Sequence, residues 1–235
     1  MGEGKYKPPP FNYCDYRCDR CEHKDTCKVY KDDQERLLDH YVKGEDPYKP
    51  EVFMQDLHEI FKKTKDMIME MAEKEGVDFS DMPDEEPPRV NPEEYAIYRL
   101  AYSYTREAHS FIKELEKVGV PETLQEDYSD LVWHHTLIAA KTGRLVSGFI
   151  DDFLDEEIRK VEEEGTLGVI RKSINLSKNA LQNMLNELPD HLYTIADLMD
   201  LLKRLASRSK LISVKKSVQK KKYSRSDWEL LFLRA

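Results

Sequence analysis

Apolar residues recur every three or four positions through most of the chain, the spacing that predicts amphipathic helices. The clearest case begins at about Pro50 and ends at Glu75, before Gly76. No sustained alternation of period two stands out, so the pattern predicts helices and no strands. The apolar stripe of this segment consists of Phe53, Leu57, Ile60, Thr64, Met67 and Met71, widened by Phe61 and Ile68.

Other segments of the chain repeat the helical spacing. Asn91 is placed to cap one helix, with Pro92 at its first position. Gly143 and Gly148 are the expected breaks in the longest candidate, and Gly165 is expected to separate it from the next helix. The expected helices cover about 32–42, 92–118, 121–164, 167–188 and 190–209.

Together these segments predict an all-α protein, an antiparallel bundle of four to five helices with an N-terminal cysteine-rich metal-binding loop. Three parts are expected along the chain. Residues 1–47 form a four-cysteine metal- or cluster-binding segment, residues 48–212 the helical bundle, and residues 213–235 a basic tail with a short apolar end.

The net charge of −9 conceals an uneven distribution. Lys203 to Arg225 contains ten basic residues and no acidic one, and the remaining 27 basic and 46 acidic residues give the rest of the chain a charge of −19. The lysines of the Lys215–Arg225 tail could contact nucleic-acid phosphates, but the acidic body opposes that approach. An acidic protein surface is an equally suitable partner.

All four cysteines of the chain, Cys14, Cys18, Cys21 and Cys27, lie within fourteen residues, in the spacing C-x3-C-x2-C-x5-C. The first residues lack the apolar stretch of a secretory signal, and no apolar run is long enough to cross a membrane. A cytoplasmic location is therefore expected, where cysteines stay reduced and tend to bind metal.

The compact spacing favours a [4Fe–4S] cluster with these four cysteines as ligands, because a chain that wraps a cubane supplies thiolates at short, unequal intervals. Zinc is the alternative, although four-cysteine zinc sites usually combine two separated C-x2-C pairs. Two short motifs resemble known ones. Cys18, Cys21 and Cys27 are similar to part of the SPASM auxiliary-cluster motif, and Cys14, Cys18 and Cys21 resemble the radical-SAM signature. Both resemblances imply cluster-ligand chemistry only.

Two further groups could carry chemistry. His135 falls on the apolar stripe of the longest helix, and His109 on the preceding helix could face it; a core histidine with a satisfied hydrogen bond is the favoured interpretation. Lys141 and Arg144 could bind an anion, although solvation at the surface is favoured. No catalytic residue is assigned, since the sequence identifies no nucleophile–base pair.

These observations predict a cluster-binding accessory protein that transfers electrons or senses redox state within a larger assembly. Its expected partner is a redox enzyme or another subunit of a complex. The alternative is a zinc-stabilised interaction module whose basic tail binds nucleic acid or an acidic protein. An enzyme with its pocket near His109 and His135 ranks last.

Overall fold

The computed structural model describes residues 13–76, 91–148 and 156–218, with side chains up to residue 210. Every regular element in these ranges is a helix, which confirms the all-α class for the described residues. The chain divides into two compact units, one of residues 1–16 and 89–235 and the other of residues 17–88. Each is described by itself. None of the helices in the described ranges combines the length and the apolar character needed to cross a bilayer.

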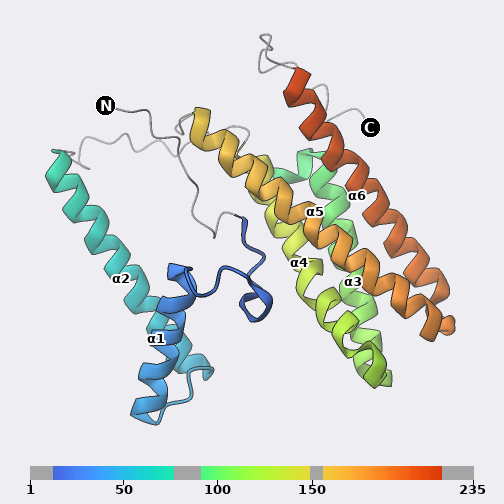
Figure 1. Ribbon diagram of the computed structural model, residues 1–235, viewed down its shortest axis with the longest axis horizontal. Helices are drawn as coiled ribbons and strands as arrows, with labels where there is room; N and C mark the ends of the chain where they lie inside the picture. The colour runs from blue at the N-terminus through green and yellow to red at the C-terminus, as the bar shows by residue number, and fades with distance from the viewer. Residues whose placement is uncertain (1–12, 77–90, 149–155, 219–235) are drawn as a thin grey trace. The chain divides into compact units, whose positions relative to one another are not determined.

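The larger unit is built on four of the described helices, here called the bundle (Figure 1). Helices α3 and α5 each pack against both α4 and α6. These helices are α3 (Ala96–Val118), α4 (Gln125–Ser147), α5 (Glu156–Glu187) and α6 (Leu192–Val218). Short connections containing the 3-10 turns η5 (Glu122–Leu124) and η6 (Pro189–His191) lead from α3 to α4 and from α5 to α6.

One continuous apolar core fills the bundle. The residues that line it come from the stripes seen in the sequence, which accounts for their helical spacing. Its fully buried large side chains include Ile97, Tyr104, Phe111, Leu115, Leu131, Ile138, Leu145, Ile170, Ile174, Leu181 and Met184. The Asn91 side chain accepts a 3.1 Å hydrogen bond from the Glu93 backbone N–H, within the 3-10 turn η4 (Pro92–Glu94) that precedes α3.

The expected helix boundaries after residue 121 need correction. Helix α4 ends at Ser147, beside the predicted break at Gly148, but it continues through Gly143. Gly165 does not separate two helices: it is buried inside α5, which is continuous from Glu156 to Glu187. Buried neighbours keep α5 helical at this position, so packing overrides the weak helix propensity of glycine.

The smaller unit contains the 3-10 turn η2 (Cys18–Arg20), α1 (Lys28–Lys43) and α2 (Pro50–Glu75). Gly44 and Gly76 end α1 and α2 in the left-handed conformation, with φ of 71° and 68°. Helix α2 has the predicted bounds, whereas α1 begins four residues before the predicted start. The assignment of α2 to a bundle of residues 48–212 stays a prediction.

Polar contacts join α1 to α2. The His40 ring hydrogen-bonds through Nδ1 to Glu45, at 2.8 Å, and through Nε2 to Asp56, at 2.9 Å. Arg36 donates to Asp56 at 2.8 Å and also pairs with Asp33. We call His40, Glu45, Asp56 and Arg36 the His40 clasp. The apolar stripe of α2 lies largely at the surface, since Phe53, Ile60, Phe61, Met67, Ile68 and Met71 are exposed.

Candidate functional site

The first cysteine belongs to the bundle unit, where the tripeptide Cys14–Asp15–Tyr16 packs against side chains of α4 and α5. The Asp15 backbone carbonyl accepts a 2.7 Å hydrogen bond from Trp133 Nε1 on α4. The Asp15 carboxylate forms a 2.6 Å ion pair with Lys172 on α5. Asp15 is buried, so these contacts replace its lost hydration. They hold the neighbouring Cys14 at a defined place on the bundle.

The backbone around Cys14 is arranged to stabilise a thiolate. Tyr16 donates its backbone N–H to Cys14 Sγ over 3.1 Å. This hydrogen bond accompanies a left-handed backbone at Tyr16, with φ of 60°, which a bulky residue rarely adopts. Hydrogen bonds to ligand sulfurs favour the charged form and tune clusters held by cysteine.

Lys141 on α4 approaches the same tripeptide. Its Nζ lies over the Tyr16 ring, 4.9 Å from the centroid. Lys141 is 6% exposed, so the prediction that it is solvated at the surface is wrong. Burial and the neighbouring Arg144 charge lower the pKa of Lys141, while Cys14, Glu162 and Asp15 act in the opposite direction. The helical pattern of α4 could not reveal that Lys141 is buried, because the tripeptide Cys14–Asp15–Tyr16 that packs there comes from a distant part of the sequence.

The other three cysteines lie in the smaller unit. Cys18 begins the turn η2, and its carbonyl accepts a 3.3 Å hydrogen bond from the Cys21 N–H. Cys27 is the N-cap residue of α1 and makes no side-chain capping hydrogen bond there. The cysteines of this unit thus lie on the turn η2, directly after it and at the start of α1.

All four cysteines are partly exposed and are present as thiols rather than as disulfides. In the ranges that the structure describes, no three side chains of His, Cys, Asp or Glu come together as a metal site. Four free thiols, with an N–H donor on Cys14 Sγ, are donors that fit a metal or cluster bound by sulfur. Ligand binding commonly completes such sites, since the bound metal itself supplies the energy that orders its loop.

Of the two histidines predicted as a possible pocket, His135 is buried in the bundle and His109 is exposed. His135 Nδ1 is 2.7 Å from the Val132 carbonyl oxygen, and the ring stacks on His109 with centroids 5.9 Å apart. Burial lowers the pKa of His135, which favours the neutral ring. The neighbouring His134 is also buried and lies 3.1 Å from Ser173 Oγ. This geometry confirms His135 as a core histidine with a satisfied hydrogen bond.

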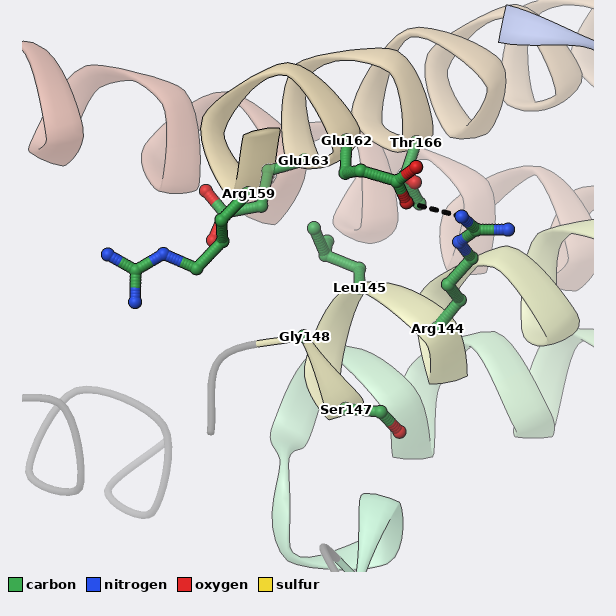
Figure 2. Close-up of a pocket in the computed structure, with 8 residues that line it drawn as sticks. All are labelled: Arg144, Leu145, Ser147, Gly148, Arg159, Glu162, Glu163 and Thr166. Atoms are coloured by element: carbon green, nitrogen blue, oxygen red, sulfur yellow. Dashed lines mark hydrogen bonds and ion pairs between the residues drawn. The ribbon is translucent and has the colours of Figure 1, made fainter. Parts of the chain in front are cut away.

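A cavity of about 270 Å³ lies between the end of α4 and the first turns of α5 (Figure 2). Arg144 and Glu162 form an ion pair across it, and Leu145 contributes an apolar wall. In Figure 2 the Arg159 side chain extends away from that pair. The Arg144–Glu162 pair thus places opposite charges that neutralise each other in the cavity lining.

Comparison with known proteins gives no family assignment. The chain matches no protein-family model, no curated protein and no solved structure. The basic tail Lys215–Arg225 lies outside the residues whose side chains the structure describes. The structure thus connects Cys14 to the bundle residues Trp133, Lys141 and Lys172, which sequence analysis did not link to the cysteines.

Proposed function

We propose that the chain binds a [4Fe–4S] cluster through Cys14, Cys18, Cys21 and Cys27. The observation that carries the proposal is the confinement of all four cysteines to fourteen residues, at short and unequal spacing. The N–H···S hydrogen bond at Cys14 supports it, because such bonds are common around cluster-ligating sulfurs. Three residues separate Cys14 from Cys18, so their Cα atoms can be no more than roughly 14 Å apart even in a fully extended chain.

In this proposal the protein is an accessory subunit that transfers electrons or senses redox state within a larger assembly. Four cysteine ligands would coordinate all four irons of the cluster and leave no iron open to a substrate. Such a cluster favours electron transfer over substrate activation. The helical bundle provides the docking body for a redox enzyme or another subunit. Its packed core gives the rigid support that such docking requires.

The test is metal and sulfide analysis of the full chain purified without oxygen. We expect about four iron and four sulfide ions per chain, with broad visible absorption. Cys21→Ser should lose most of both, whereas His23→Ala, an exposed change in the same loop, should retain them. Full cluster content in Cys21→Ser would contradict the proposed ligand set.

Zinc is the second candidate, because Cys18 and Cys21 form a C-x2-C pair and the tail is strongly basic. The protein would then be a zinc-stabilised interaction module that binds nucleic acid or an acidic partner through Lys215–Arg225. A colourless protein with about one zinc ion per chain would support this alternative and exclude the cluster. Binding to a DNA or RNA oligonucleotide should then weaken steeply with salt and disappear when residues 213–226 are deleted.

A further inference from the structure

Lys141 is a buried cation beside the first proposed ligand. It is 6% exposed, whereas lysine is almost never buried unless its charge is matched. The nearby Arg144 increases the positive charge of this region. The position therefore demands a negative partner, since an unmatched buried ammonium is costly.

Three groups near Lys141 favour its charged form, namely Cys14, Glu162 and Asp15. Both carboxylates already have another cation: Glu162 pairs with Arg144, and Asp15 pairs with Lys172. The negative groups near Lys141 therefore lie both on α5 and on the segment that carries Cys14.

Lys141 also acts through Tyr16. Its Nζ lies 4.9 Å from the centroid of the Tyr16 ring, within the range of a cation–π interaction. The same Tyr16 donates its N–H to Cys14 Sγ from a left-handed backbone. By holding the Tyr16 ring, Lys141 helps to fix the Tyr16 backbone, whose N–H donates to Cys14 Sγ.

We infer that Lys141 is a positioning residue for the metal centre, which fixes Tyr16 so that its N–H is held on Cys14 Sγ. This inference rests on the proposed metal centre. Groups that orient ligands in this way commonly change metal affinity by about 10- to 100-fold. Trp133 and Lys172 hold the backbone and carboxylate of Asp15, whereas Lys141 contacts Tyr16, the residue that donates to the sulfur.

The experiment is a titration of the full-length chain with Co²⁺, in which binding is measured by the thiolate-to-cobalt charge-transfer absorption. Lys141→Met should weaken Co²⁺ binding about tenfold, because it keeps the length of the side chain but removes its charge. Lys141→Arg keeps the charge and should stay within about threefold of the unaltered chain. Lys113→Met removes an exposed lysine of α3 and serves as the control, with unchanged affinity expected.

A second pair of variants tests the contact through Tyr16 if Lys141→Met folds poorly by circular dichroism. Tyr16→Leu should weaken Co²⁺ binding several-fold, whereas Tyr16→Phe keeps the ring and should bind normally. Unchanged affinity in folded Lys141→Met, or in Tyr16→Leu, would overturn the role of Lys141. Equal Co²⁺ binding by Cys21→Ser and the unaltered chain would instead refute the metal centre.

Discussion

The indole nitrogen of Trp133 donates a 2.7 Å hydrogen bond to the backbone carbonyl of Asp15, joining residues 118 positions apart. Together with the Lys172 ion pair, this bond anchors the segment that carries Cys14. The cysteine pattern alone describes a loop. The contacts of Asp15 show that one end of this loop is fixed by the bundle.

We expect Trp133→Phe to lower the free energy of unfolding by about 1 kcal/mol, because it removes the donor to a buried carbonyl. Urea denaturation followed by circular dichroism measures the change. Tyr193→Phe also removes a polar hydrogen from an aromatic residue, at a site that is 84% exposed, and should have no effect. Equal stability of the two variants would show that the Trp133 bond contributes nothing.

The His40 clasp should weaken as pH rises. Hydrogen bonds to Glu45 and then Asp56 raise the pKa of His40. A raised pKa in the folded state means that the stabilisation is complete below the unfolded value of about 6.5 and is lost as pH rises through the folded value. Hydrogen exchange of α1, corrected for its intrinsic pH dependence, should therefore increase over this window.

Two variants make the clasp prediction specific. His40→Gln should remove the extra pH dependence of exchange in α1, because glutamine does not titrate. Asp56→Asn should bring the NMR titration of the His40 ring to lower pH, whereas Asp39→Asn, an exposed change on the same helix, should leave it in place. A His40 titration that ignores Asp56→Asn would refute the role of that carboxylate.

Replacing either of two glycines of the bundle unit by alanine should change the free energy of unfolding, and the two changes should have opposite signs. Gly168 lies inside α5, and an added Cβ would meet open space, so Gly168→Ala should stabilise by about 0.5–1 kcal/mol. Gly119 ends α3 with φ of 88°, also in open space, so Gly119→Ala should destabilise by about 1–2 kcal/mol through its backbone alone. Urea denaturation of the two variants measures both effects, and a shared sign would contradict the assignment.

The core should tolerate loss of the Tyr104 hydroxyl. This atom is buried and forms no well-aligned hydrogen bond among the described residues, and burial raises the pKa of Tyr104 while the neighbouring Ser177 acts in the opposite direction. Tyr104→Phe should leave the free energy of unfolding unchanged or raise it by up to about 1 kcal/mol. Tyr128→Phe makes the same chemical change where the hydroxyl bonds Glu116, and should destabilise. A clear loss of stability in Tyr104→Phe would contradict this expectation and indicate that the hydroxyl bonds Ser177 or a water.

Local patterns predicted the helices whose ends carry strong signals. Helix α2 begins at Pro50 and ends before Gly76, as the apolar repeat and these two residues indicated. The Asn91 cap formed for the same reason, since its side chain bonds a backbone only two residues away. Such signals act over one helical turn and are therefore visible in the sequence.

The contacts that define the candidate site act over much longer separations. Gly165 looked like a break because glycine weakens an isolated helix, but the buried surface of α5 outweighs that preference. Lys141 looked solvated because the partner that covers it, Tyr16, lies far away in the sequence. No periodicity along one helix can predict which distant segment packs on it.

Synthesis on the ribosome proceeds from the N-terminus, so Cys14 emerges well before the residues that anchor its neighbour. Asp15 can meet Lys172 only after most of α5 has been translated. Closing so long a loop is slow compared with local helix formation. A nascent chain would consequently present Cys14 before its support exists. If the proposed metal centre is correct, its stable loading should be a late event in maturation.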